Sequence, residues 1–207
     1  IYPLRTLFPY TTLFRSIRTL DAHSEVFGYL IQSNGMKYED IGVLQTAKEA
    51  VNPKAHFKRN YIVVAPDKGL KSKVGDFADV TCDKIRNPET GKISGVKVSD
   101  FGRYDSGDFT FNDIANHSAR RFLIIDDICE RGGTFFGVEK ALREAGATAG
   151  IDLFVTHGVM PEGTNFEALL NTFDNVYVHT MQLGRYNEAK SACLFSDGNF
   201  HCKNIYA

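Results

Sequence analysis

Four short apolar runs alternate with amphipathic segments along the middle and the C-terminal part of this chain. The runs are residues 61–66, 121–127, 151–158 and 175–180. Their apolar residues are continuous rather than alternating, which is typical of strands that are covered on both faces. Strands and helices in this order form right-handed βαβ units around a parallel sheet. The sequence therefore predicts an α/β fold with a central, mostly parallel sheet flanked by helices.

The segments between these runs carry helix signals. Residues 134–147 place four apolar side chains on one helical stripe, and glycines follow as stop signals. Residues 165–173 form a second amphipathic pattern, and residues 69–80 a third that Gly75 weakens. Residues 79–100 differ, because two β-like arms flank a polar centre with Asn-Pro and Thr-Gly pairs. We expect this last segment to be a β-hairpin with a long, flexible tip.

Composition excludes several classes of protein. The 207 residues suffice for one ordinary domain with a proper core, and the formal net charge of −1 does not favour a general nucleic-acid or anionic-membrane surface. No apolar run reaches the ~20 residues of a membrane span, and no signal-peptide core is evident. The four cysteines have no C-x-x-C spacing, so we expect free thiols in a reducing cytoplasm rather than a zinc site; they are Cys82, Cys129, Cys193 and Cys202.

Two adjacent aspartates, Asp126 and Asp127, stand at the end of the second apolar run. The residues Arg131 to Thr134 (RGGT) then lead into the next helix. Ligands of open α/β sheets bind beyond the carboxyl ends of the strands. Backbone N–H groups at a helix N-terminus bind phosphate, and glycines allow it to come close. Thr134 would add a hydroxyl donor and Arg131 a positive charge.

Carboxylates beside a phosphate site need a separate role, because they repel the anion. Accepting hydrogen bonds from sugar hydroxyls is one such role, and holding Mg²⁺ is another. The pattern therefore predicts a site for a phosphorylated sugar, with its diol toward the aspartates and its phosphate toward the glycine turn. The alternative is a capped helix with a solvated acidic turn, which two glycines alone would favour. The full strand–DD–x₃–GGT–helix pattern favours a site.

Five segments of the sequence resemble those of a known family. LIIDDICERGGTF (residues 123–135) resembles the PRPP-binding loop of type I phosphoribosyltransferase folds. Four further segments resemble the ribose-phosphate pyrophosphokinase (PRPP synthetase) family more narrowly, and all five occur in that family's order between about residues 17 and 181. The four are LDAHS (20–24), VVAPDKG (63–69), DKIRNPETGKISG (83–95) and FVTHGVMPEGT (154–164). The tail after Gly184 matches no segment of the family.

The resemblance implies roles for individual residues. The ribose hydroxyls would be bound by Asp126 and Asp127. The metal Mg²⁺ would be served by His23 and Asp67, directly or through water, and Lys84 and Arg86 would close over the transferring phosphoryl group as catalytic residues. The rest of the ribose-phosphate site would be Cys129, Glu130, Arg131, Gly132, Gly133 and Thr134. Glu130 stands where the family usually has an aspartate, and Arg131 where it usually has a small residue.

The implied reaction converts ribose 5-phosphate and ATP into PRPP and AMP. Such transfers depend mostly on alignment and on neutralising charge on the phosphoryl oxygens. Two alternatives stay open: a phosphoribosyltransferase that consumes PRPP, and a non-catalytic ribose-phosphate-binding or regulatory subunit. LDAHS and the Lys84/Arg86 segment argue against the phosphoribosyltransferase, and the catalytic residues of that segment fit a non-catalytic subunit poorly. Members of the family have two similar α/β domains and form homo-oligomers, and this chain would supply only the C-terminal domain.

The stretch TLFPYTTLFRS (residues 6–16) fits neither helix nor strand periodicity, and Pro9 interrupts both. One back-translation of it looks like a short-read sequencing adapter. We therefore expect residues 1–16 to be a non-native translated segment and residues 17–207 to be the phosphoribosyltransferase-like domain. Deletion of residues 1–16 is expected to leave thermal stability nearly unchanged.

Overall fold

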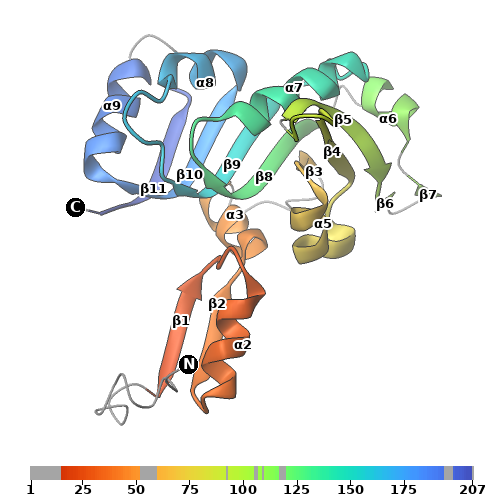
Figure 1. The fold of residues 1–207 in the computed structure, drawn as a ribbon. Helices are drawn as coiled ribbons and strands as arrows, with labels where there is room; N and C mark the ends of the chain where they lie inside the picture. Colours follow the sequence, from red (N-terminus) through yellow and green to blue (C-terminus); the bar gives the residue numbers. More distant parts are fainter. Residues whose placement is uncertain are drawn as a thin grey trace.

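A computed structural model describes residues 15–51, 60–91, 93–104, 107–108, 110–116, 120–193 and 198–206. These residues form a sheet domain and a small lobe that projects from it (Figure 1). Of the segment expected to be non-native, residues 1–14 lie outside the described part, and Ser16 is the first residue of the lobe's first strand. In the described residues no helix is both long and apolar enough to cross a membrane.

A seven-stranded sheet forms the centre of the main domain, in the order β11-β10-β9-β8-β3-β4-β5. All neighbours are parallel except the antiparallel pair β4–β5. The mostly parallel sheet expected from the apolar runs is therefore confirmed. The strands are β3 (Tyr61–Ala65), β4 (Val80–Arg86), β5 (Ile93–Phe101), β8 (Arg121–Cys129), β9 (Ile151–Gly158), β10 (Asn175–Gln182) and β11 (Phe200–Tyr206).

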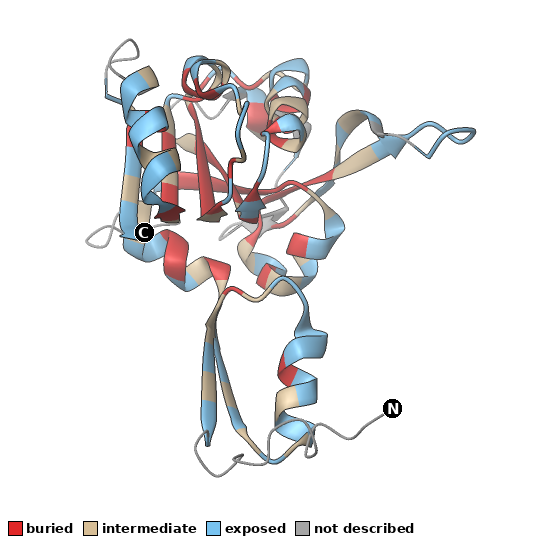
Figure 2. Ribbon diagram, turned by 60° about the vertical axis from the view of Figure 1, so that its left-hand side comes forward, coloured by how far each residue is buried: buried red, intermediate tan, exposed pale blue. Residues whose placement is uncertain are grey.

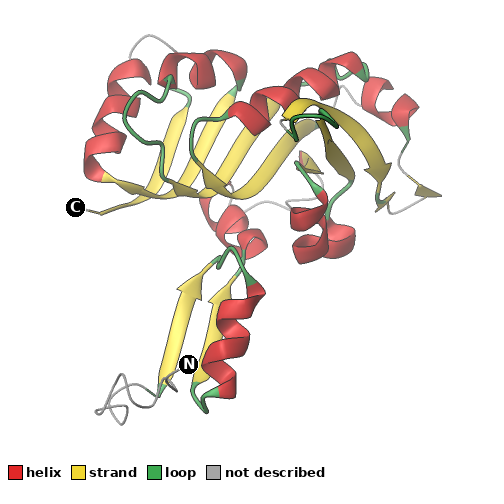
Figure 3. Ribbon diagram, in the orientation of Figure 1, coloured by secondary structure: helices red, strands yellow, loops and turns green. Residues whose placement is uncertain are grey.

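Helices cover both faces of this sheet (Figure 3). One face carries α7 (Gly133–Glu144), α8 (Phe166–Thr172), α9 (Leu183–Cys193) and the short α6 (Phe111–Asn116); the other carries α3 (Val43–Val51) and α5 (Lys68–Val74). Alternate residues of β3 serve the two layers, since Ile62 and Val64 join the core beneath α7 while Val63 and Ala65 pack with α3 and α5. Continuous apolar strands are needed for burial on both faces.

Two expected elements and the unmatched tail can be compared with the structure in detail. The hairpin of residues 79–100 is confirmed as β4–β5, with irregular register at two points. The helix expected over residues 69–80 is shorter, because α5 ends at Val74 and Gly75 adopts φ +57°, after which a 3₁₀ turn (Gly75–Phe77) follows. The unmatched tail forms α9 and β11, and β11 extends the sheet in parallel beside β10. A small antiparallel pair, β6 (Arg103–Tyr104) and β7 (Gly107–Asp108), lies between β5 and α6.

The lobe was not expected from the sequence. It consists of two parallel strands, β1 (Ser16–Leu20) and β2 (Lys37–Ile41), joined through the helix α2 (Glu25–Ser33). Figure 2 shows it mostly in the colours of exposed and intermediate residues, whereas the sheet of the main domain is largely buried. Gly28 is the one buried residue of α2, and it packs against the ring of Tyr38.

Candidate functional site

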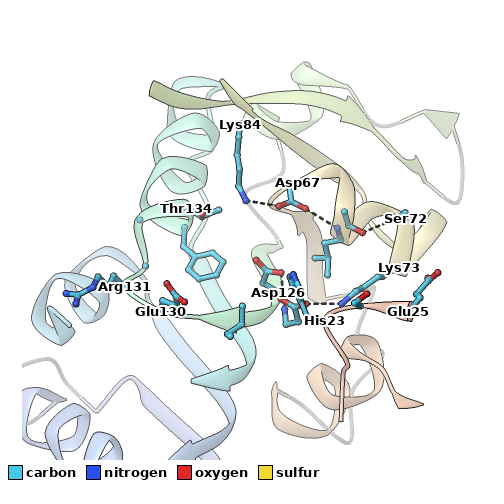
Figure 4. A pocket seen from close by; sticks show the side chains of 18 of the residues that line it. His23, Glu25, Asp67, Ser72, Lys73, Lys84, Asp126, Glu130, Arg131 and Thr134 are labelled. Atoms are coloured by element: carbon cyan, nitrogen blue, oxygen red, sulfur yellow. Dashed lines mark hydrogen bonds and ion pairs between the residues drawn. The ribbon is translucent and has the colours of Figure 1, made fainter. Parts of the chain in front are cut away.

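The candidate site lies where the direction of the chain through the sheet reverses. From β3 the chain crosses through α5 to β4 on one side, whereas from β8 it crosses through α7 to β9 on the other. The carboxyl ends of β3 and β8 therefore lie together at a switch point, which is where α/β sheets bind ligands. A cavity of about 730 Å³ opens there, and Asp67, Asp126 and Asp127 all line it (Figure 4).

Asp127 is fixed in place by two basic side chains. Its Oδ2 atom accepts a hydrogen bond from Lys73 Nζ at 2.9 Å and lies 2.7 Å from His23 Nδ1. Burial alone would raise the pKa of Asp127, but its bonds to Lys73 and His23 hold that pKa below its usual range. Asp127 is thus an ionised acceptor near neutral pH.

The pKa of the neighbouring Asp126 is shifted in the opposite direction. Its Oδ1 atom accepts a hydrogen bond from the backbone N–H of Asp127 at 2.9 Å. Burial, together with the negative charge of Asp127, raises the pKa of Asp126 to about 7. The two adjacent carboxyls therefore differ in protonation near neutral pH, with Asp126 able to donate a hydrogen bond and Asp127 able only to accept.

The glycine turn forms the next wall of the cavity. Gly132 adopts φ +81° immediately before α7, and a Cβ atom there would lie 2.8 Å from Leu169 Cδ2, so the turn requires glycine. A Cβ at Gly133 would meet only open space. The 12-residue helix α7 begins at Gly133, and its first residues, Gly133 and Thr134, line the cavity. This end of the cavity suits an anion.

The other residues of the predicted ribose-phosphate site differ in how they face the cavity. Arg131 lines the cavity, but in Figure 4 its side chain extends away from the carboxylates. Cys129 is fully buried in the core, and burial raises the pKa of its thiol to about 12. Its carbonyl accepts hydrogen bonds from the N–H groups of Val159 and Met160, so Cys129 supports the loop from behind instead of lining the cavity. Glu130 lines the cavity as expected.

Of the two expected catalytic residues, Lys84 reaches the site and Arg86 does not. Lys84 Nζ donates to Asp67 Oδ2 at 2.8 Å, while Asp67 Oδ1 caps α5 by accepting the N–H of Leu70. Burial would raise the pKa of Asp67, but the bond from Lys84 brings it below the usual range. Arg86 is exposed on the hairpin and donates to the carbonyl of Gly91 at 3.2 Å.

The expected magnesium ligands, His23 and Asp67, both line the cavity, but each is engaged by another side chain. Within the described ranges, no group of three or more His, Cys, Asp and Glu side chains could hold a metal ion. The oxygen donors do fit a Mg²⁺ that keeps its waters and is carried largely by substrate phosphates, as is common for this ion. A dedicated all-protein site does not fit.

Sequence reasoning missed Lys73. Its ammonium group lies between the lobe and the sheet, bonded to Asp127 and to the carbonyl of Ala22 at 3.1 Å, with Asp21 Oδ1 at 3.8 Å. A weak signal was present, because Lys73 follows the buried Leu70 by three positions and so lies on the inner flank of α5. Its partners come from distant parts of the chain, and spacing alone does not reveal them.

The chain is similar to known proteins over about half of its length. No family model matches the chain. Two curated relatives are a ribose-phosphate pyrophosphokinase of Hyphomonas neptunium, 32% identical over 109 residues (50% of this chain and 30% of that protein), and one of Pyrococcus abyssi, 33% identical over 102 residues (49% and 32%). The resemblance to ribose-phosphate pyrophosphokinases is confirmed. The chain spans about a third of the length of these relatives.

A solved structure has a similar fold over nearly the whole chain. The phosphoribosylpyrophosphate synthetase of Mycobacterium smegmatis superposes with a TM-score of 0.56 at 16% identity, covering 97% of this chain and 58% of that one. The expected type I phosphoribosyltransferase-like α/β fold is therefore confirmed. The roles of individual site residues stay predictions.

Proposed function

We propose that this chain carries the ribose 5-phosphate site of a ribose-phosphate pyrophosphokinase, which transfers pyrophosphate from ATP to make PRPP and AMP. One observation carries the proposal: a pair of carboxyls and a phosphate-compatible helix N-terminus line the same cavity at the switch point of the sheet. The similarity to pyrophosphokinases supports the choice of reaction over a phosphoribosyltransferase that consumes PRPP.

In this proposal the sugar phosphate spans the cavity. The 5-phosphate accepts hydrogen bonds from the N–H groups of residues 130–134 and from Thr134, where the helix dipole favours negative charge. The diol lies at the other end, and its hydroxyls bond to Asp126 and Asp127. The two carboxyls differ in protonation, so one can donate to an oxygen of the sugar while the other accepts from a hydroxyl.

The transfer step would use the side of the cavity beneath the hairpin. The anomeric hydroxyl attacks the β-phosphorus of ATP; an O–Pβ bond forms, the bond from Pβ to the bridging oxygen of AMP breaks, and the hydroxyl proton leaves to solvent. Lys84 would leave Asp67 and neutralise charge on the phosphoryl oxygens. A bound Mg²⁺, with Asp67 and His23 as candidate ligands, would supply further charge neutralisation.

In this proposal the chain supplies only part of a pyrophosphokinase. The chain spans about a third of its curated relatives, and we infer that the remaining part contributes to the ATP site and to oligomer formation. We also infer a cytoplasmic location, since three cysteines in the described part, Cys82, Cys129 and Cys202, are free thiols.

Calorimetry with ribose 5-phosphate in the presence of Mg²⁺ tests the proposed site. Ribose and inorganic phosphate, titrated separately, should bind far more weakly, because each occupies only one end of the cavity. Asp127→Asn should weaken binding of ribose 5-phosphate by about 1.5–3 kcal/mol, since it removes a charged acceptor. Asp83→Asn is the matched control, because Asp83 pairs with Lys68 and does not line the cavity. Equal affinities of the Asp127→Asn variant and the unmodified chain would refute the site.

A further inference from the structure

Lys73 occupies an unusual position for a lysine near the end of a short helix. Its side chain is only 21% exposed, and its ammonium group faces three oxygen atoms: Asp127 Oδ2, the Ala22 carbonyl and Asp21 Oδ1. A partly buried ammonium group is stable only where such acceptors compensate for lost water. By contrast, Lys71 on the same helix makes one long bond, at 3.4 Å, to the carbonyl of Ala78 and does not line the cavity.

The contacts of Lys73 join two parts of the molecule. Ala22 and Asp21 belong to the segment that leaves β1, whereas Asp127 belongs to β8. His23, from the same segment as Ala22, contacts the same oxygen of Asp127 at 2.7 Å. We call the group Lys73, His23 and Asp127 the clasp. Through His23 and Lys73, which Figure 4 labels, one carboxylate of the candidate sugar site is joined to the segment that leads to the lobe.

The clasp also controls the orientation of the carboxylate. Within the described part of the chain, the hydrogen bonds to the side chain of Asp127 fall on Oδ2. Two donors on the same oxygen restrict rotation about the Cβ–Cγ bond and leave Oδ1 for an incoming hydroxyl. A carboxylate without Lys73 would keep its charge in a partly buried place with one donor fewer, and its orientation would be less defined.

We propose that Lys73 is a positioning residue, which fixes Asp127 for sugar binding and at the same time docks the lobe onto the sheet domain. The role in sugar binding rests on the proposed function. The docking role concerns the ligand-free protein and does not. Binding of a sugar to Asp127 would, through the clasp, further restrain the segment Leu20–His23 and with it the lobe.

The test combines two measurements on five variants of the full chain. The variants are Lys73→Met, Lys73→Arg, Asp127→Asn, the double variant Lys73→Met/Asp127→Asn, and the control Lys71→Met, which removes the same charge from the same helix. Calorimetry measures affinity for ribose 5-phosphate. Hydrogen exchange of the ligand-free proteins measures opening at the amides of Asp21 and Ala22, which bond to the Ile41 carbonyl and to Asp40 Oδ1.

We expect Lys73→Met to weaken binding about tenfold and to speed exchange in the lobe, with Lys71→Met unchanged in both. Lys73→Arg, which keeps the charge and the donors, should recover most of the affinity, whereas a loss of packing alone would not be rescued in this way. Because Lys73 acts through Asp127, adding Lys73→Met to Asp127→Asn should change the affinity by less than about twofold.

Affinities of Lys73→Met equal to those of Lys71→Met, or losses that add fully in the double variant, would overturn the positioning role. Unchanged exchange at Asp21 and Ala22 in Lys73→Met would overturn the docking role. If the unmodified chain does not bind ribose 5-phosphate, the proposed function fails and the positioning role fails with it. The exchange data then decide the docking role alone, so the two failures can be told apart.

Discussion

The sheet domain and the lobe distribute their apolar side chains in opposite ways. In the sheet domain Phe122 and Phe154 are fully buried, with 0% exposure. In the lobe, four large apolar side chains of α2 are between 44% and 71% exposed: Val26, Phe27, Tyr29 and Leu30. Two strands and one short helix bury too little surface to be stable alone. Apolar burial therefore holds the sheet domain together, whereas a few polar contacts determine where the lobe lies.

Those polar contacts all involve residues Leu20 to His23. His157 Nε2 bonds to the Leu20 carbonyl at 2.8 Å, and Thr156 Oγ1 donates to Asp21 Oδ2 at 2.7 Å. Asp21 is buried and has φ +48°, so this junction combines a strained backbone with a buried carboxyl. The lobe therefore meets the sheet domain at the edge that also forms the candidate site.

The largest expected effect contrasts two phenylalanines. Phe154→Ala removes a fully buried ring from the sheet domain and should cost about 3–5 kcal/mol of unfolding free energy. Phe27→Ala removes a 44% exposed ring from the lobe and should cost less than about 1 kcal/mol. Urea unfolding followed by circular dichroism measures both. Similar losses in the two variants would show that the lobe is part of the same core.

The next effect concerns the partly buried carboxyl of Asp126. Its pKa is raised from 3.8 to about 7 in the folded protein, so between these values the folded state binds more protons and stability falls as the pH rises. Asp126→Asn removes this penalty. It should stabilise the protein at pH 8 by up to about 4 kcal/mol, at about 1.4 kcal/mol per pKa unit, and have little effect at pH 4. Unfolding curves at both pH values check this, and a pH-independent difference would contradict the raised pKa.

A smaller effect separates the two glycines before α7. Gly132→Ala should cost about 1–3 kcal/mol, because φ is +81° and the new methyl group would meet Leu169. Gly133→Ala should change the unfolding free energy by less than about 0.5 kcal/mol, since its methyl group would point into open space. That space is the cavity, so Gly133→Ala should still weaken ribose 5-phosphate binding in calorimetry. Unimpaired binding by Gly133→Ala would place the phosphate elsewhere.

The smallest effect is on the exposed face of the lobe. Tyr29→Ser replaces a side chain that is 71% exposed, and the unfolding free energy should change by less than about 0.5 kcal/mol. The exposed apolar surface of α2 should nevertheless promote association, which this variant would reduce. Sedimentation velocity at several concentrations measures the association. A marked loss of stability in Tyr29→Ser would mean that α2 packs more closely than its exposure indicates.

The sequence predicted the sheet domain better than the lobe for a physical reason. Strand β8 and helix α7 have strong patterns, a continuous apolar run followed by an apolar stripe, because each packs into a large core. The lobe strands, SIRTL and KYEDI, are mixed in polarity and have no such core, so their sequences carry little periodic signal. The tail was missed because α9 is only weakly amphipathic, although it covers the edge of the sheet.

The candidate site was predictable to a similar, limited degree. The residues of one continuous segment, from Asp126 to Thr134, have a local sequence pattern that indicates a sugar-phosphate site. Lys73 lies outside this pattern, because its role depends on the segment between β1 and α2, which brings the carbonyl of Ala22 within 3.1 Å of its ammonium group. Arg86 is the opposite case. The family motif predicts it at the site, but on the hairpin it bonds to Gly91 and does not line the cavity.

The proposed cavity between β3 and β8 should bind a sugar phosphate across its two ends. The most direct measurement is a titration of the ¹⁵N-labelled chain with ribose 5-phosphate and Mg²⁺, followed by amide NMR. We expect the largest shifts on residues 130–134 and on Asp126 and Asp127, with β11 unaffected. Shifts confined to other residues, or none at saturating ligand, would contradict it.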